Sequence, residues 1–363
     1  MTAPAPLLFT PFKLRELTLR NRVMVSPMCQ YSCGPDGALT DWHLVHLGAR
    51  AAGGAGLVMV EATAVEARGR LSLGDSGLWD DAQIAPLKRV LDFVKSRGAA
   101  AAVQLAHGGR KAWSDRKGNW SEPGREPIVA PSALPFDADW ATPNELSADA
   151  LDGIVAAWVA AGRRALAAGA DCVEIHSAHG YLLHSFLSPL CNRRADDHGG
   201  SLENRARLLR RVARELRALW PAQMPLLARL SCDDWAAGGF TIDEAVLVAR
   251  WLKQDGVDLI DCSSGGAVPF QQIAVGPGYQ VPFSARIRRE AEIPTAAVGM
   301  ITTGDQAESI LQSRDADLVA LARIELYDPH WPLHAARELG LAPDDPACPW
   351  PKQYGRALSV LPR

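Results

Sequence analysis

The stretch "LAAGADCVEIHSAHGY", residues 166–181, decides the fold. It begins as the end of an amphipathic helix and passes through Gly169 into a short apolar run, Cys172–His176. It then ends in polar residues that include His179 and Tyr181. Glycine commonly follows the last turn of a helix, and a short continuous apolar run is typical of a strand buried on both faces. We interpret the stretch as a helix-to-strand unit of a parallel sheet.

The same unit recurs along nearly the whole chain. The predicted strands are Val23–Pro27, Leu57–Glu61, Ala101–Leu105, Cys172–His176, Leu226–Leu230, Leu259–Cys262, Thr295–Val298 and Leu318–Leu321. The predicted helices are Asp41–Ala52, Gln83–Arg97, Ser147–Ala168, Leu202–Leu219, Ile242–Asp255, Ser284–Ala291, Gly304–Gln312 and Pro332–Leu339. Such alternation is typical of the α/β class, and eight units favour a closed (β/α)8 TIM barrel. An open doubly wound sheet is the alternative.

Two segments fall outside this repeat. Phe12–Leu19 predicts a short hairpin ahead of the first barrel strand. Trp113–Asn144 is rich in proline, glycine and tryptophan and predicts a long loop after the third strand. Because no low-complexity linker divides the sequence, we expect a single domain over residues 1–363, with a barrel core over about 8–340 and a tail over 341–363.

The composition limits the classes of partner. The 363 residues carry a net charge of −3 at pH 7, which argues against nucleic acid because phosphate binding needs a basic face. The beginning of the sequence does not resemble a secretory signal, and the apolar runs are too short to span a bilayer. Seven cysteines without metal-ligand spacing predict free thiols, a cytoplasmic location and neither a metal site nor an iron–sulfur cluster.

Polar residues gather at the ends of the predicted strands. In a barrel these ends and the loops after them surround one mouth, where active sites lie. The residues concerned are Ser26, Cys29, Tyr31, Glu61, Gln104, His176, His179, Tyr181, Arg229, Ser263, Ser264 and Arg323. Any one of them alone is commonly a solvated rim residue. Gln104, His176 and Arg229 from three consecutive strands together favour an active site.

The ends of the seventh and eighth strands, in "VGMITTGD" and "ALAR", are typical of a phosphate site. Gly299 would allow close approach of the backbone, and Arg323 would add a charge-assisted contact. No glycine-rich dinucleotide fingerprint or P-loop follows any predicted strand. The pattern therefore predicts a phosphorylated cofactor held in the barrel.

Seven motifs together resemble one known family. They are "SPMCQY", "EATAV", "QLAHGGRKA", "EIHSAHGYLLHSFLSPLCNRRADDHGGSLENR", "DLIDCSSGG", "AVGMITTGDQAE" and "PHWP". The sequence resembles the old yellow enzymes, which are flavin-dependent ene-reductases, and specifically the bacterial xenobiotic reductase and thermophilic-like branch with cysteine in "PMCQY". The resemblance covers about Leu8 to Arg356. It implies non-covalently bound FMN, NADPH or NADH as reductant, and electron-poor alkenes as substrates.

The resemblance also implies roles for single residues. The residues expected at FMN are Ser26, Pro27, Met28, Cys29, Ala62, Gln104, Arg229, Ser264, Gly299, Ala322 and Arg323. Relatives often have glycine where this chain has Ala322. The residues expected at the substrate are Tyr31, Lys111, His176, His179, Tyr181 and Arg356.

The catalytic roles implied by the resemblance fall on three of these residues. His176 and His179 would hold the substrate carbonyl oxygen while hydride adds to the β-carbon, and Tyr181 would protonate the α-carbon. Arg356 lies in "PKQYGRA", a tail segment that in some relatives reaches a neighbouring active site, so we expect a homo-oligomer, a dimer or an assembly of dimers.

Three alternatives remain at this stage. An FMN barrel with other chemistry, such as a dienoyl-thioester reductase or an amine dehydrogenase, typically carries an extra domain and an iron–sulfur cluster. A phosphate-binding aldolase or isomerase would need a catalytic lysine or glutamate, for which Lys111 and Glu61 are the candidates. A flavin-binding module without catalysis would not need His176, His179 and Tyr181 together.

Overall fold

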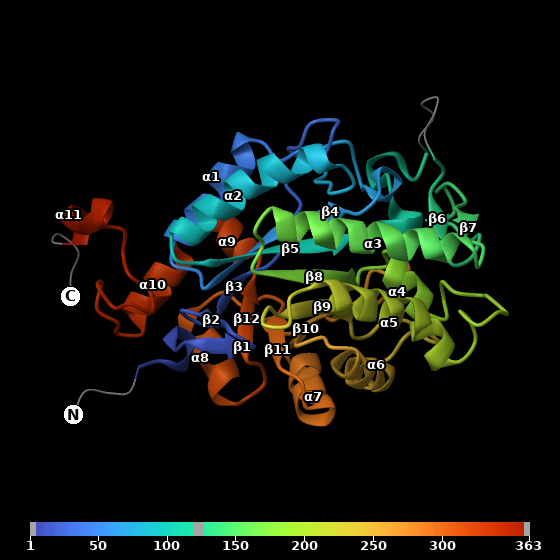
Figure 1. Cartoon of the computed structure of the whole chain (residues 1–363). Helices are drawn as coiled ribbons and strands as arrows, with labels where there is room; N and C mark the ends of the chain where they lie inside the picture. The colour runs from blue at the N-terminus through green and yellow to red at the C-terminus, as the bar shows by residue number, and fades with distance from the viewer. Residues whose placement is uncertain (1–4, 120–125, 359–363) are drawn as a thin grey trace.

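Eight parallel strands close into a barrel, as predicted (Figure 1). The computed structural model describes residues 5–119 and 126–358. The barrel strands are β3 (Val23–Val25), β4 (Leu57–Ala64), β5 (Ala100–Ala106), β8 (Cys172–Ser177), β9 (Leu226–Ser231), β10 (Leu259–Ser263), β11 (Thr295–Val298) and β12 (Leu318–Leu321). β12 pairs with β3 through Val319 and Val23, which closes the sheet and rules out the open doubly wound alternative.

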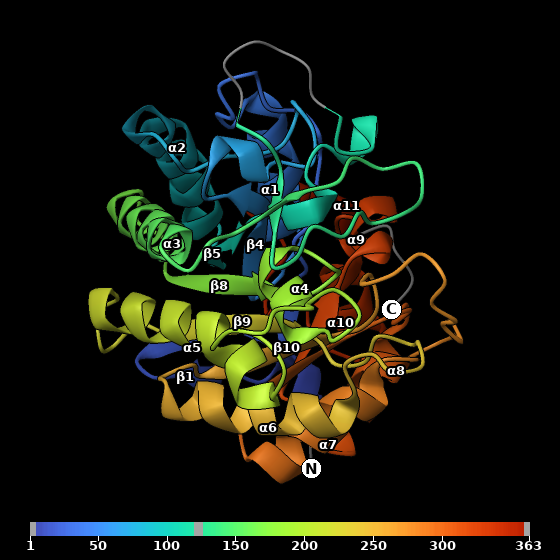
Figure 2. The same cartoon turned by 90° about the vertical axis from the view of Figure 1, so that its right-hand side faces the viewer.

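The predicted helices form the outer ring around these strands (Figure 2). They are α1 (Asp41–Ala52), α2 (Ile84–Ser96), α3 (Ala150–Ala167), α5 (Leu202–Leu219), α6 (Ile242–Gln254), α7 (Val281–Ala291), α8 (Gly304–Gln312) and α10 (Trp331–Glu338). Three short helices were missed, namely α4 (Leu182–Leu187), α9 (Arg323–Tyr327) and α11 (Gly355–Leu358). Helices of four to six residues are too short to show a helical period in the sequence.

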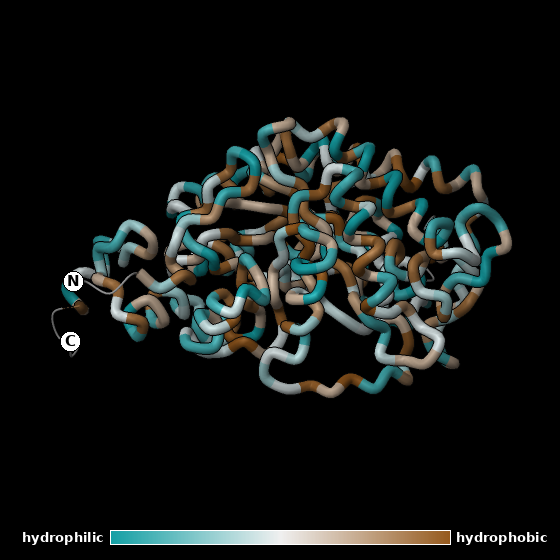
Figure 3. Tube along the Cα trace, turned by 90° about the horizontal axis from the view of Figure 1, so that it is seen from below, coloured by the Kyte–Doolittle hydropathy of each residue, from teal (hydrophilic) through white to brown (hydrophobic). Residues whose placement is uncertain are grey.

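The pattern of α5 shows why a helix forms and which face it buries. Its buried residues include Leu208, Leu209, Val212 and Leu216, which follow the three- and four-residue spacing of one helix face. Arginines occupy much of the other face. Hydrophobic segments lie mainly in the middle of the molecule, and hydrophilic segments lie mainly toward its edge (Figure 3).

The predicted hairpin is confirmed and lies at the amino-terminal end of the barrel. β1 (Phe12–Leu14) and β2 (Leu17–Leu19) pair in antiparallel fashion. Leu14 and Leu19 are buried in the same apolar cluster as Met59 of β4. The hairpin therefore covers the end of the barrel opposite to the one that carries α4 (Figure 1).

The predicted long loop after β5 is confirmed over the residues that the structure describes. It contains short turns and the two-residue strand β6 (Val129–Ala130), which pairs with β7 (Asn144–Glu145). Trp113 at its beginning is buried, which anchors the loop to the barrel. No helix within 5–119 and 126–358 is long and apolar enough to cross a membrane.

The start of α6 provides a test of local stability. Thr241 Oγ1 accepts the Glu244 amide hydrogen at 3.4 Å, and Glu244 Oε2 accepts the Thr241 amide hydrogen at 3.2 Å. We expect Thr241→Ala to lower the free energy of unfolding by about 1 kcal/mol, because it leaves one amide of the first turn without its acceptor. Urea denaturation measures this change. Thr241→Ser keeps the hydroxyl and is the control; equal stability of both variants would contradict the capping role.

Candidate active site

The parallel register of neighbouring strands places the polar residues of the strand ends side by side at two adjacent levels of the sheet. Gln104 of β5 pairs with Glu174 of β8, and His176 of β8 pairs with Arg229 of β9. Arg229 in turn pairs with Asp261 of β10. Residues that lie far apart in the chain therefore become neighbours across the sheet, as the analysis of strand ends predicted.

His176, His179 and Tyr181 form a compact group of rings. The ring centres of His176 and His179 are 5.1 Å apart, and those of His176 and Tyr181 are 4.9 Å apart. The interplanar angles of 88° and 70° show edge-to-face contact. The structure thus brings the three predicted catalytic residues together.

His176 is a neutral hydrogen-bond donor. Its Nδ1 accepts the amide hydrogen of Ala178 at 3.2 Å, so the neutral ring carries its hydrogen on Nε2. Burial and then the nearby charge of Arg229 hold the pKa of His176 well below its usual value. The side chain therefore offers an uncharged Nε2–H group rather than a cation.

His179 lies in the left-handed region, with φ of 60°, which is uncommon for a residue other than glycine. Its backbone is held from two sides. The amide hydrogen is donated to Ser231 Oγ at 2.9 Å, and the carbonyl oxygen accepts from Lys111 Nζ at 2.9 Å. Its ring Nε2 lies 2.7 Å from Ser263 Oγ, and burial lowers its pKa well below the usual value. The strained backbone places a second neutral imidazole beside His176.

Tyr181 keeps its proton across the ordinary pH range. Burial and then the neighbouring Cys29 and Tyr31 raise the pKa of its phenol well above the usual value. Lys111 approaches it, with Nζ 5.4 Å from the centre of the Tyr181 ring. Burial and the nearby Arg110 lower the pKa of Lys111 to about 8. Lys111 also donates to Gly266 O at 3.0 Å, so it fixes the backbone around the group of rings.

The loop after β3 carries Ser26, Pro27, Met28, Cys29 and Tyr31. The Ser26 amide hydrogen is donated to Leu321 O at 2.8 Å, and Ser26 Oγ is buried without a hydrogen-bond partner among the described residues. Burial and the carboxylate of Glu61 raise the pKa of the Cys29 thiol well above its usual value. Tyr31 is 63 % exposed and stands at the rim of the site.

A buried cluster of polar and ionisable side chains lies beside these residues. Gln104 Nε2 donates to Glu174 Oε1 at 2.7 Å, and Arg229 Nε lies 3.3 Å from Asp261 Oδ2. Burial and the neighbouring Asp261 raise the pKa of Glu174 to about 8. Sequence reasoning missed Glu174 and Asp261. The available signal was an acidic residue inside each of the apolar runs "CVEIH" and "LIDCS".

A cavity of about 170 Å³ lies at the ends of β11 and β12. Its lining includes Arg229, Gly299, Ala322 and Arg323, and Gly299 has φ of 126°, which favours glycine. Ser264 is not in the lining; its hydroxyl donates to Gln280 Oε1 at 2.6 Å. The lining instead includes Ser263, Tyr279 and Gln280, which the sequence analysis did not assign to a cofactor.

These residues fit FMN. The phosphate would be held by Arg323 and the backbone around Gly299, where the cavity offers space and a cation. The unpartnered hydroxyl of Ser26 lies on the loop expected to contact the flavin. Gln104 and the cation of Arg229 would provide polar partners for its ring.

A larger cavity, of about 410 Å³, lies outside this set of residues. Trp79, Trp113 and Arg68 are among its lining residues. Arg68 already pairs with Glu66 at 2.8 Å and with Glu126 at 3.4 Å. We assign this cavity no part in the catalytic site, because it lacks the convergent neutral donors found around His176.

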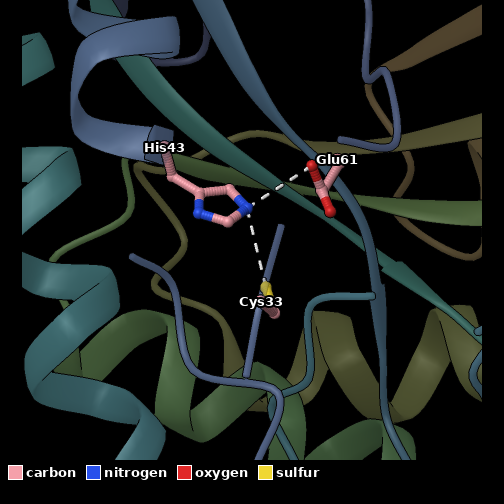
Figure 4. A group of neighbouring side chains, drawn as sticks. All are labelled: Cys33, His43 and Glu61. Carbon is pink, nitrogen blue, oxygen red and sulfur yellow. Dashed lines mark hydrogen bonds and ion pairs between the residues drawn. The ribbon is translucent and has the colours of Figure 1, made fainter. Parts of the chain in front are cut away.

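Cys33, His43 and Glu61 form a cluster of metal-ligand type with ligand atoms within 4.8 Å of one another (Figure 4). His43 Nδ1 accepts the Thr40 amide hydrogen at 2.9 Å, so Nε2 carries the ring hydrogen. That nitrogen lies 3.5 Å from Cys33 Sγ and 3.8 Å from Glu61 Oε2. The three side chains therefore form a polar network around the Nε2–H group of His43. A metal ion bound between them would need a lone pair on Nε2, which carries the ring hydrogen instead.

Arg356 is the one predicted substrate residue that lies away from the others. It is exposed in α11, at the opposite end of the molecule from α4 (Figure 1). Within one chain the structure does not bring it to His176 and Tyr181. A role in the active site of a neighbouring subunit stays a prediction.

The comparisons with known proteins agree with this site. Residues 7–341 match the model of the NADH:flavin oxidoreductase / NADH oxidase family. The chain belongs to this family. It is 48 % identical over 335 residues to the NADPH dehydrogenase of Geobacillus sp. (strain WCH70), covering 92 % of this chain and 95 % of the relative. The old yellow enzyme homologue from Zymomonas mobilis superposes with a TM-score of 0.78 at 25 % identity, covering 96 % of this chain and 98 % of that one.

Family membership confirms several predictions. The chain is an oxidoreductase with FMN as its cofactor, built on the TIM barrel of the old yellow enzymes. The aldolase or isomerase alternative is therefore wrong. Its two candidate residues are also engaged elsewhere, since Lys111 donates to the His179 and Gly266 carbonyls and Glu61 accepts the Gln30 amide hydrogen.

One similar solved structure is that of a longer protein. The structure of 2-naphthoyl-CoA reductase superposes with a TM-score of 0.85 at 25 % identity and is covered over only 53 % of its length, while 94 % of this chain is covered. The chain spans about half of that protein, so the neighbour informs the barrel alone.

The neutral state of the two histidines can be measured directly. We expect neither His176 nor His179 to titrate between about pH 5.5 and pH 8, because their pKa values lie well below the ordinary value of about 6.5. NMR of histidine labelled with ¹³C at Cε1, with His176→Gln and His179→Gln for assignment, measures this. The unfolded chain would take up these protons near pH 6.5, so the pair makes the free energy of unfolding fall as the pH drops below that value. A midpoint near 6.5 for either ring would contradict the assignment.

Proposed function

We propose that this protein is an ene-reductase that takes reducing equivalents from NADPH or NADH and reduces the activated C=C bond of α,β-unsaturated carbonyl compounds. The observation that carries the proposal is the contact of two neutral imidazoles with one protonated phenol at the barrel mouth. The NADPH dehydrogenase at 48 % identity supports NADPH as the reductant.

The two histidines polarise the substrate. A carbonyl oxygen that accepts hydrogen bonds from His176 and His179 loses electron density, which makes the β-carbon electrophilic. Negative charge then develops on that oxygen when hydride adds to the β-carbon. Donors that are fixed in a partly dry site stabilise this charge more than water would, because the local dielectric constant is low. The hydride chemistry itself is that of FMN when bound.

Tyr181 completes the reaction as the proton donor. An ordinary phenol has a pKa of about 10, and burial raises that of Tyr181 further, so the group remains protonated until a strong base appears. The α-carbon of the enolate is such a base. Lys111 holds the adjacent backbone and lies over the Tyr181 ring, which keeps the phenol in place.

The assembly and location belong to the same proposal. We infer a cytoplasmic enzyme from the seven free cysteines, five of which are buried. We infer a dimer from the tail segment around Arg356, which lies at the far end of its own chain and is exposed there.

An anaerobic titration in two steps tests the proposed reaction. NADPH is added to the purified yellow protein while the visible absorption of the flavin is followed, and 2-cyclohexenone is added afterwards. We expect bleaching and then full recovery of the yellow spectrum. Bleaching without recovery would contradict the ene-reductase proposal while leaving the NADPH step intact.

Tyr181→Phe tests the proton donor. We expect reoxidation of the reduced protein by 2-cyclohexenone to slow by at least about a hundredfold, because the α-carbon loses its acid. Flavin reduction by NADPH should change little. Stopped-flow absorbance measures both rates, and Tyr327→Phe, at a position 88 % exposed, is the matched control. Loss of flavin reduction with normal reoxidation would show that Tyr181 has another role.

A further inference from the structure

The turn between His179 and Tyr181 is held in an unusual backbone conformation. His179 and Gly180 have φ of 60° and 74°, so two consecutive residues are left-handed. A Cβ atom at Gly180 would lie 2.1 Å from Gly266 O, which shows how closely the turn packs against the loop after β10. The conformation of this turn sets the distance between the second imidazole and the phenol.

The Gly180 amide hydrogen is donated to the side chain of His184. Its nitrogen lies 2.8 Å from Nδ1 of His184, a fully buried residue of α4. A ring nitrogen that accepts a hydrogen bond must carry its lone pair there. The neutral ring of His184 therefore carries its hydrogen on Nε2.

Asp234 faces that second nitrogen. Asp234 Oδ1 lies 3.0 Å from His184 Nε2, and both side chains are fully buried. The other oxygen, Oδ2, accepts from Ser188 Oγ at 2.6 Å and from the Phe240 amide at 2.8 Å. Although burial opposes it, the proximity of His184 and these hydrogen bonds keep the pKa of Asp234 below its usual value, so the carboxylate is ionised.

We propose that His184 and Asp234 are a positioning pair, in which the carboxylate fixes the His184 tautomer and the tautomer fixes the Gly180 turn. The pair touches neither substrate nor cofactor in this assignment and acts through His179 and Tyr181. This proposal depends on the proposed function in one respect, because it takes His179 as the oxyanion donor and Tyr181 as the acid.

The physical argument is that such a pair is expensive to bury. A buried carboxylate that faces a neutral imidazole costs free energy unless hydrogen bonds compensate it, so well-packed apolar residues of similar volume would serve the fold alone at least as well. Here the pair and the amide that it holds join three parts of the fold. Gly180 follows β8, His184 belongs to α4 and Asp234 follows β9. An apolar side chain at position 184 would fill the space and leave a buried amide without its acceptor.

The decisive variant is Asp234→Asn. Its amide oxygen would take over the hydrogen bonds from Ser188 and Phe240, so its NH₂ group would face His184 Nε2. The favoured tautomer of His184 would then reverse, and an N–H group would face the Gly180 amide. His184→Leu removes the acceptor without this reversal. His184→Asn offers a carboxamide oxygen near the position of Nδ1 and keeps an acceptor for Gly180.

Two readouts apply to the FMN-loaded protein. The first is hydrogen exchange of the Gly180 amide by mass spectrometry. The second is the affinity for 4-hydroxybenzaldehyde, whose phenolate oxygen resembles an enolate, read from the long-wavelength absorption of the flavin complex. We expect Asp234→Asn and His184→Leu to speed exchange and to weaken binding by about tenfold, the size of one lost backbone hydrogen bond. His184→Asn should stay within about threefold of the wild type, as should the control Ser188→Ala, which leaves the Oδ1 contact in place.

The outcomes separate the two proposals. Unchanged exchange and affinity in Asp234→Asn and His184→Leu would overturn the positioning role, as would a loss in His184→Asn equal to that in His184→Leu. If Asp234→Asn does not fold, the comparison of the two His184 variants decides the question. If the wild type fails to bind the phenol and fails to reduce 2-cyclohexenone, the proposed function is overturned, and hydrogen exchange alone then decides the role of the pair.

Discussion

The parallel register of β5, β8, β9 and β10 is the constraint on which the site depends. It places Gln104 beside Glu174, His176 beside Arg229, and Arg229 beside Asp261. Each of these positions is buried, so the polar groups must satisfy one another or a bound molecule. A slip of one residue in any of these strands would turn its polar side chains to the other face of the sheet.

The environment of these side chains explains the protonation states in the candidate site. Arg229 pairs with Asp261, and its positive charge favours the ionised form of Glu174. The same charge lowers the pKa values of His176 and His179 and so contributes to keeping them neutral. Neutral imidazoles can donate hydrogen bonds to a carbonyl oxygen without adding a further buried cation. The same burial that lowers the histidine pKa values raises that of Tyr181, so one physical cause sets the protonation states of the proposed donors and of the proposed acid.

The backbone around His179 shows how contacts from several elements hold an unfavourable conformation in place. Ser231, Lys111 and His184 come from β9, the loop after β5 and α4, and each hydrogen-bonds to the backbone of His179 or Gly180. A left-handed residue that is not glycine persists when its surroundings determine it from several sides. The turn at His179 and Gly180 is therefore held by side chains from three other parts of the barrel.

The sequence by itself determined the barrel. Its eight short apolar runs are typical of buried strands, and the segments between them have the three- and four-residue spacing of amphipathic helices, so the two kinds of element can be told apart. It also determined the group of His176, His179 and Tyr181, since these residues lie close together after one strand. Only the tertiary structure decided that Asp261 pairs with Arg229, that Glu174 accepts a hydrogen bond from Gln104, that the Ser264 hydroxyl donates to Gln280, and that Asp234 faces His184. The physical reason is that these contacts join strands and loops separated by many residues, and a pairing of that kind leaves no periodic signal along the chain.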